Sequence, residues 1–283
     1  MKTKVLATIA LALFTLSSCN LGKAIKDITV KMKKEMQATH DYEKNVDKWG
    51  EIITTEVENP MPFSKVQING NINVVFTQDS VFCIKMYGNE KAVAAYKYWW
   101  AESEFVINTE EGVKFDRTQE YNAVTPDTPA ITLYITAPFI TDIVVYGASN
   151  IEISDGLSQD CCLNFQINGA GDIEMEHAKI GGIFTVNISG AGNIDFNDVV
   201  CDDNVITHIQ GAGNIEADNL KCKDMDAEVN GAGNIELNVD CDNLKADING
   251  AGDIKLRGQC KTLDPNHGGT QGDIDDKLLK VNG

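Results

Sequence analysis

From residue 147 onward, apolar and polar residues alternate with a period of two, and the whole pattern repeats about every 20 residues. The alternation runs outward from a Gly-Ala-Gly-(Asn/Asp)-Ile motif, in which the Ile and every second residue around it are apolar. β-Branched residues on the apolar parity of such an alternation predict strands rather than helices. Intact motifs open at Gly169, Gly190, Gly211, Gly231 and Gly250, and degenerate copies occur at Gly147 and Gly272.

One motif per period is typical of a solenoid, in which each unit buries its apolar face only against its neighbours. The units are rich in strand-forming residues and lack the Leu/Asn signature of leucine-rich repeats. The pattern therefore predicts an all-β chain, a right-handed parallel β-helix with coils stacked about 4.8 Å apart. The motif glycines are expected to mark a corner where a positive φ or close backbone approach excludes larger residues. The motif isoleucines are expected to form one buried column of Ile173, Ile194, Ile215, Ile235 and Ile254.

The first residues predict an exported lipoprotein. Two lysines precede an apolar stretch, Val5 to Phe14, which is too short to span a bilayer comfortably. The next four residues, Leu16-Ser17-Ser18-Cys19, resemble a bacterial lipobox, in which the Cys is diacylated and becomes the mature N-terminus. The alternative is an ordinary signal peptide that contains a Cys. We expect residues 1–18 to be a lipoprotein signal peptide and Cys19 to anchor the chain to the outer membrane.

Three regions follow the predicted signal peptide. Residues 19–50 hold the anchor and a Lys-rich segment whose apolar spacing suits either a short amphipathic helix or a solvated tether. Residues 51–146 form a strand-rich N-terminal part, interrupted by a predicted helix from Glu90 to Trp100. Residues 147–283 form the repeat β-helix.

The charge of the chain narrows the choice of partner. The formal net charge is -18 at pH 7, and it becomes -20 when residues 1–18, with two lysines and no acids, are removed. Non-specific binding to nucleic acid needs clustered cations, so we expect no nucleic-acid partner. A glycan or a basic envelope protein is easier to accommodate, in addition to the membrane that Cys19 would reach through its lipid.

Four cysteines recur in phase with the coils, and three interpretations stay open. Buried free thiols are the first. Disulfides between neighbouring coils are the second, because a stacking distance of about 4.8 Å lies inside the allowed Cα range. A tetrahedral metal site is the weakest, because ligands in a straight column do not converge on one point. The four residues are Cys201, Cys222, Cys241 and Cys260.

Two polar columns also follow the repeat. The motif Asn/Asp column predicts either an amide ladder between coils or a calcium site, although the chain lacks the nine-residue repeat of calcium-binding β-rolls. An acidic row two residues later predicts a solvated face, with weak cation binding as the alternative. The first column is Asn150, Asp172, Asn193, Asn214, Asn234, Asp253 and Asp273, and the second is Glu152, Glu174, Asp195, Glu216 and Glu236.

No catalytic constellation stands out from the repeat. Polysaccharide lyases and glycoside hydrolases also use β-helices, but they need convergent carboxylates or basic residues that face uronates. The acids of this chain follow the coils and its four histidines fall at unrelated phases. We therefore expect no enzyme, no catalytic or metal-binding residue and no cofactor. The candidate ligand surface is Tyr98, Trp99 and Trp100, which suits sugar stacking or docking; the alternative is that these aromatics belong to the core.

Several segments, taken in order, are similar to one known family. A lipobox Cys is followed by FSKVQINGNINVVFTQ, AVAAYKYWWAESEFVINTEEGVKF and ITLYITAPFITDIVVYGASNIEI, and then by the Gly-Ala-Gly-Asn-Ile coils. This order resembles the head GIN domain family of auto-transporter adhesins, which is common in Bacteroidetes lipoproteins. The resemblance covers roughly residues 50–280. It implies a β-helical fold and carries over no catalytic residues.

Two classes of function stay open at this point. The first is a lipid-anchored surface module for adhesion or ligand binding. The second is a periplasm-facing envelope protein that binds another envelope component or responds to stress. Residues 20–23 lack the acidic run often associated with surface export in Bacteroidetes, which keeps the second class open. A polysaccharide-active enzyme is a third alternative.

Overall fold

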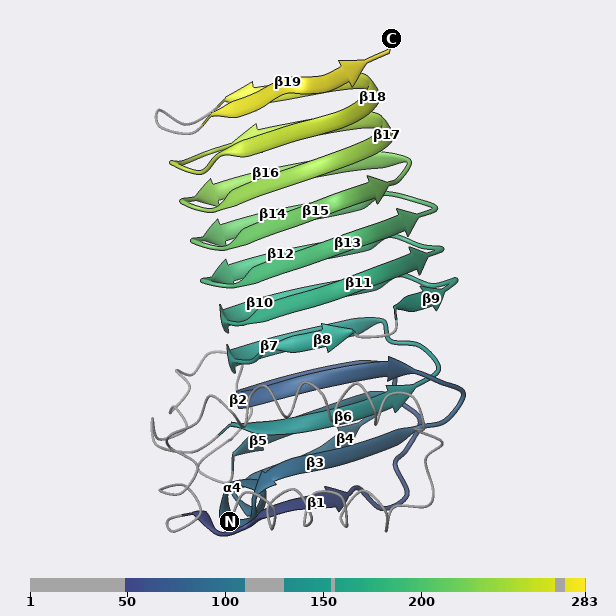
Figure 1. Ribbon diagram of the computed structural model, residues 1–283, viewed down its shortest axis with the longest axis vertical. Coiled ribbons are helices and arrows are strands. Elements are labelled where there is room, and N and C mark those ends of the chain that lie inside the picture. The colour runs from purple at the N-terminus through teal and green to yellow at the C-terminus, as the bar shows by residue number, and fades with distance from the viewer. Residues whose placement is uncertain (1–48, 110–129, 154–155, 268–272, 283) are drawn as a thin grey trace, which may run out of the picture.

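The computed structural model describes residues 49–109, 130–153, 156–267 and 273–282. The predicted signal peptide, Cys19 and most of the predicted helix or tether lie outside the described residues. The described chain is almost entirely β-strand and forms one elongated stack of coils (Figure 1). The predicted β-solenoid is confirmed. No helix in the described part of the chain has the length and apolar character of a membrane span.

Each repeat supplies one strand to each of two parallel stacks. The first stack contains β7 (Asp142–Ala148), β10 (Leu163–Ala170), β12 (Phe184–Gly190), β14 (Val205–Gly211) and β16 (Asp224–Gly231). The second contains β8 (Ile151–Ile153), β9 (Leu157–Gln159), β11 (Asp172–Ile180), β13 (Asn193–Cys201) and β15 (Asn214–Lys221). The long strands β17 (Asn234–Ile248) and β18 (Ile254–His267) continue both stacks, and β19 (Ile274–Val281) extends the second.

The N-terminal part continues the same two stacks in the other direction along the solenoid. Its long strand β2 (Lys65–Gln78) pairs with β7 through its first half and with β8 through its second half. Parallel partners of β2 come next, β5 (Glu104–Thr109) on the first stack and β6 (Ile131–Ala137) on the second. Beyond them pairing becomes antiparallel. β4 (Tyr96–Ala101) pairs with β5, β3 (Cys83–Asn89) pairs with β6, and β1 (Ile52–Glu56) pairs with β3.

The predicted helix from Glu90 to Trp100 is wrong beyond its first turn. The helix α4 covers only Glu90–Ala94, and the aromatic run that follows forms β4, which pairs with β5. Consecutive aromatic residues favour a pleated, half-buried surface over a helix. The hydroxyl of Tyr96 also donates a hydrogen bond to the carbonyl of Asn71 in β2, at 3.0 Å.

The predicted isoleucine column is confirmed as part of the core. Ile194, Ile215 and Ile235 are paired in register on successive coils, and each is 1% exposed. The column runs from Ile151 to Ile254, all buried, and ends at Ile274 on β19, which is half-buried. Facing residues of the first stack form a matching buried column, which contains Ile167, Ile188, Ile209, Val229 and Ile248.

The first glycine of the motif makes the corner with a positive φ at Gly147, Gly169, Gly190, Gly211 and Gly231. Gly190 has a φ of +142°, a conformation that side-chain-bearing residues rarely adopt. A Cβ at Gly190 would clash with the carbonyl oxygen of Gly169 on the preceding coil, and the backbone N–H of Ala191 donates to that same oxygen at 2.8 Å. The glycine therefore lets the chain turn while its backbone bonds to the coil beside it.

Candidate ligand-binding groove

The motif Asn/Asp column forms a hydrogen-bonded ladder on the outer face of the second stack. The amide nitrogen of Asn214 donates to the amide oxygen of Asn193 at 2.9 Å, and Asn234 donates to Asn214 at 3.1 Å. The ladder continues at one end to the carboxylate of Asp172, which accepts from Asn193 at 2.8 Å. The predicted amide ladder is confirmed.

A second ladder lies on the same face, closer to the opposite corner. The amide nitrogen of Asn219 donates to the carboxylate of Asp198 at 2.9 Å, and that of Asn238 donates to the amide oxygen of Asn219 at 3.4 Å. This ladder was not predicted from the sequence, although its three residues recur at intervals of 21 and 19 positions. A register shift between Ala217 and Leu220 hides it, because β15 holds one residue more than β17 over this stretch.

A third row of outward side chains runs beside the second ladder. The carboxylate of Asp240 accepts a hydrogen bond from the amide nitrogen of Gln259 at 3.0 Å and lies 3.9 Å from the ammonium of Lys221. Val200 precedes this group on β13, and Lys280 follows it on β19. Each of the strands β13, β15, β17, β18 and β19 thus contributes one side chain to this third row.

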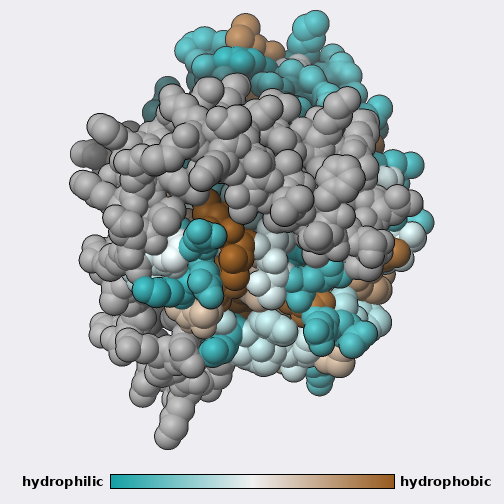
Figure 2. All heavy atoms as spheres, turned by 60° about the horizontal axis from the view of Figure 1, so that its bottom comes forward, coloured by the Kyte–Doolittle hydropathy of each residue, from teal (hydrophilic) through white to brown (hydrophobic). Residues whose placement is uncertain are grey.

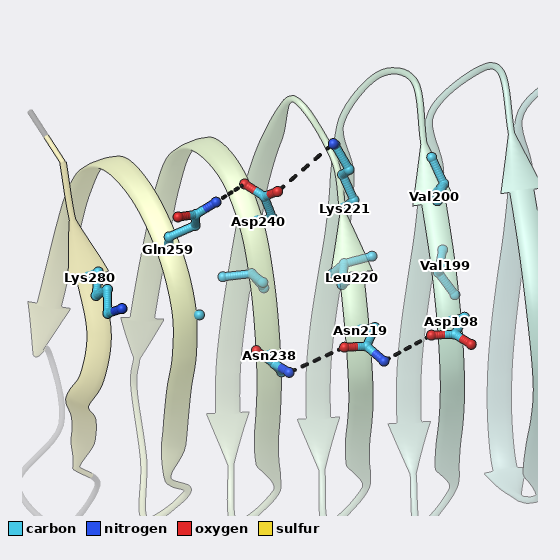
Figure 3. A pocket seen from close by; sticks show the side chains of 12 residues that line it. Asp198, Val199, Val200, Asn219, Leu220, Lys221, Asn238, Asp240, Gln259 and Lys280 are labelled. Carbon is cyan, nitrogen blue, oxygen red and sulfur yellow. Dashed lines mark hydrogen bonds and ion pairs between the residues drawn. The ribbon is translucent and has the colours of Figure 1, made fainter.

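The second ladder and the third row enclose an open groove of about 400 Å³ (Figure 3). Its floor is a row of residues paired on successive coils, namely Val199, Leu220, Val239 and Gly258. Gly258 has a φ of +95°, and a Cβ there would clash with the carbonyl oxygen of Val239. Because the floor follows strand pairing, the groove crosses the strands and runs along the solenoid axis.

The charges that line the groove balance, although the chain as a whole is strongly acidic. Two acids, Asp198 and Asp240, and two bases, Lys221 and Lys280, line the groove. The remaining polar lining consists of amides, which donate and accept hydrogen bonds without adding charge. The groove therefore differs chemically from the rest of this face.

The predicted acidic row is stacked in register beside the motif ladder. Glu174, Asp195 and Glu216 occupy successive coils, and the row ends at Glu236, which pairs with Lys255 at 3.3 Å and with Arg257 at 2.7 Å. Among the described residues, no group of three or more His, Cys, Asp or Glu side chains is arranged to hold a metal ion.

The aromatic residues predicted as a ligand surface are divided between the two faces of β4. Tyr98 and Trp100 share one face and both contact Phe105, with ring centroids 5.7 and 5.0 Å apart. Trp99 alternates to the other face, opposite Val106. Tyr98 is 38% exposed, whereas both tryptophans are partly buried. The three side chains therefore do not form a single platform.

Other apolar side chains are exposed in the N-terminal part of the solenoid. Met61, Val81 and Phe139 lie in the turns before β2, before β3 and between β6 and β7, and each is at least 40% exposed. Figure 2 looks toward this end and shows a strip of apolar surface between hydrophilic residues. Behind Met61, Phe63 is buried against Phe82, with ring centroids 5.3 Å apart.

Two histidines contact carboxylates, but on different stacks. His208 of β14 lies 3.1 Å from Glu228, beside a hollow of about 230 Å³ on the first stack. His177 of β11 lies 3.2 Å from Asp198 on the second stack. The two imidazoles therefore do not converge on one reacting atom.

The cysteine column stacks on successive coils as predicted. Cys241 and Cys260 are paired in register, and all four thiols are buried and unbridged. Burial raises the pKa of Cys201 and of Cys260. The thiol of Cys222 hydrogen-bonds to Cys241, which raises the pKa of Cys222 and lowers that of Cys241.

We expect the four column thiols to react with Ellman's reagent only after denaturation. Burial limits access, and a raised pKa reduces the thiolate fraction near neutral pH at Cys201 and Cys260. Exposed Cys162 should react first in the folded protein, and Cys162→Ser should remove that fast phase. Thiol counting in denaturant, with and without prior reduction, checks the expectation. Column thiols that need a reductant in order to react would show that disulfides join the coils.

The fold of this chain occurs in other proteins. A family model described as "Putative auto-transporter adhesin, head GIN domain" matches residues 62–259 and, a second time, residues 208–282. No curated protein matches the chain.

Several solved structures are similar to this chain over most of their length. A "putative adhesin" from Bacteroides fragilis NCTC 9343 is 18% identical, with a TM-score of 0.65 over 80% of this chain and 96% of its own. A "putative lipid binding protein" from Parabacteroides distasonis ATCC 8503 is 17% identical, with a TM-score of 0.58 over 79% and 97%. A "putative adhesin" from Parabacteroides merdae ATCC 43184 is 18% identical, with a TM-score of 0.53 over 79% and 96%. At these identities the likeness shows a shared fold.

Proposed function

Because the chain belongs to the head GIN domain family, which is described as auto-transporter adhesins, we propose that it is a lipid-anchored module of the cell envelope that binds ligands through its outer face. In this proposal Cys19 carries the lipid, and the solenoid that begins near residue 49 presents the binding surface. Adhesion at the cell surface is the role that the family description favours.

The proposed binding role is supported above all by the arrangement of side chains on the outer face. The outer face of the second stack presents hydrogen-bonding side chains in register on successive coils, and two rows of them enclose a groove. The β-backbone fixes their spacing at about 4.8 Å before any ligand arrives. Side chains that are held in place in this way lose little entropy when they bind a ligand.

Binding is favoured over catalysis by the chemistry of the groove. Asp198 and Asp240 each accept a hydrogen bond from an amide on a neighbouring coil, and the residues that line the groove include no histidine. Asp198 contacts His177 on its other side, but His177 does not line the groove. The family and the similar structures are described by adhesion or lipid binding.

A periplasm-facing binding protein is the second candidate. It is favoured by residues 20–23, Asn-Leu-Gly-Lys, which lack the acidic run associated with surface export in Bacteroidetes. Protease treatment of intact cells separates the two candidates. Cleavage of the solenoid without cell lysis supports surface adhesion, whereas protection until the outer membrane is opened supports the periplasmic protein.

Replacing Cys19 with Ala is expected to release the protein from membranes or to leave it unprocessed. The lipobox cysteine is the proposed attachment point, and acyl chains supply most of the membrane affinity of a lipoprotein. Fractionation of cells, followed by immunoblotting for mature size, checks this expectation. Cys162→Ser, which removes an exposed cysteine of the solenoid, is the control and should fractionate like the wild type. Mature Cys19→Ala protein in the membrane fraction would contradict lipid anchoring.

A further inference from the structure

We infer that the groove over β13, β15, β17 and β18 is a binding site for a neutral oligosaccharide that lies along the solenoid axis. The inference rests on the proposed binding function and assigns the ligand class of that site. The groove crosses successive coils, so a linear polymer in it meets a new set of side chains about every 4.8 Å. A repeating ligand suits a repeating surface of this kind.

The hydrogen-bonding groups of the groove match hydroxyl groups. In the second ladder, each amide uses one N–H to bond to the coil before it, which leaves the other N–H and carbonyl lone pairs for a ligand. Sugar hydroxyls both donate and accept, so they can bond to amides and carboxylates alike. Across the groove, the hydrogen bond between Gln259 and Asp240 holds a second pair of such groups in place.

The shape and apolar surface of the groove also suit a sugar ring. Val200 is 40% exposed at one end of the third row and offers an apolar surface to the C–H groups of a pyranose. The floor residues Val199, Leu220 and Val239 are buried, and Gly258 continues the floor without a side chain. Ligand sites commonly combine apolar contact surface with a few fixed polar groups in this manner.

The charge balance favours an uncharged ligand. Two carboxylates and two lysines line the groove, while the chain around it carries a formal charge of -18. An anionic polymer would be repelled by the protein as a whole. A cationic polymer would be attracted by the overall charge, but within the groove its cations would lie against Lys221 and Lys280. A neutral ligand incurs neither cost.

An extended peptide is the main competing ligand, and the strand pairing disfavours it. Peptides that add to a sheet need a free backbone edge. Here β13 pairs with β11 and β15, β15 pairs with β13 and β17, and β17 pairs with β15 and β18. β18 in turn pairs with β17 and β19, so the strands that form the floor are bonded on both sides and leave only side chains to contact a ligand. Lys280 lies on β19, which among the described strands pairs only with β18.

The test uses the full mature chain in detergent and isothermal titration calorimetry. The probes are neutral gluco-, manno-, galacto- and N-acetylglucosamine oligosaccharides of increasing length, an oligogalacturonate and a lysine-rich peptide. The binding variant is Asn219→Ala/Asn238→Ala, which truncates the second ladder. The matched control is Asn243→Ala, also on β17, whose ladder to Asp224 and Thr262 lies outside the groove. Thermal unfolding of each variant confirms that the fold is kept.

We expect at least one neutral oligosaccharide to bind more tightly as it lengthens. Its affinity should fall about tenfold or more in the double variant, which loses at least one hydrogen bond per amide, and should be unchanged in Asn243→Ala. The inference is overturned if no neutral probe binds at about 10 mM, if binding is equal in the double variant, or if the oligogalacturonate or the peptide binds in its place. Membrane anchoring is measured separately through Cys19→Ala, so failure of one proposal leaves the other distinguishable.

Discussion

Replacing Ile215 with Asp is expected to lower the free energy of unfolding by about 4–5 kcal/mol, the largest effect of any single change considered. Ile215 is 1% exposed and lies between Ile194 and Ile235 on the neighbouring coils. A carboxylate there would be buried without a partner, and the apolar contacts with both neighbours would be lost. Domains of this size have stabilities of roughly 5–15 kcal/mol, so the solenoid would retain little of its own.

Denaturant unfolding followed by circular dichroism measures this effect, together with limited proteolysis to detect local opening. Repeat proteins can unfold coil by coil, so both probes are needed. Ile215→Val is the conservative control and should cost about 1 kcal/mol. Ile274→Asp is the matched control, because Ile274 ends the same column on β19 and is only half-buried. Equal losses at Ile215 and Ile274 would show that the column is not what holds the coils together.

Replacing Gly192 with Ala is expected to destabilise the solenoid by about 3 kcal/mol, which is far more than one methyl group costs at an ordinary site. Gly192 is the second glycine of its motif and is buried. Its new Cβ would lie 2.6 Å from the carbonyl oxygen of Gly171 and 2.9 Å from a methyl group of Ile167. The carbonyl belongs to the backbone of the adjacent coil, so relief requires the two coils to move apart.

The control exchanges the same two residue types one position earlier. Ala191 is exposed, and Ala191→Gly should cost no more than about 1 kcal/mol. Thermal and denaturant unfolding of both variants provide the comparison. A loss for Gly192→Ala as small as that for Ala191→Gly would mean that the coils can separate at the corner at little cost.

The helix predicted from Glu90 to Trp100 in the N-terminal part was wrong for a physical reason. Residues 90–100 have no glycine or proline to mark a break, so the pattern extended a helix through Tyr96 and the tryptophans. In the structure, pairing of β4 with β5 and the hydrogen bond from Tyr96 to Asn71 favour a strand. The pairing strand and Asn71 lie 25 or fewer residues away along the chain, but no periodic pattern in the sequence predicts these contacts.

The candidate groove could not be predicted from the sequence, for a different reason. The motif ladder was predictable because Asn193, Asn214 and Asn234 hold a fixed place in an obvious repeat. The second ladder recurs as well, but the shift between Ala217 and Leu220 places Asn238 four residues after its motif Asn, whereas Asp198 and Asn219 each follow theirs by five. Only paired backbones reveal that these two amides face each other. The aromatic surface at Tyr98, Trp99 and Trp100 stays a prediction, now with Tyr98 as its most exposed member.

The solenoid, the stacking of its isoleucines and cysteines, and the amide ladder of the motif could all be predicted from the repeat in the sequence. This was possible because each coil contacts its neighbours at equivalent positions, so a periodic sequence specifies periodic contacts directly. Three features could be seen only in the tertiary structure. They are the motif glycine that has a positive φ, the end of α4, and the groove lined by Asp198, Lys221, Asp240 and Lys280. These features depend on the register between coils of unequal length and on pairing that breaks the repeat. Neither is specified by the period of the sequence, because one added residue changes which side chains meet across two strands.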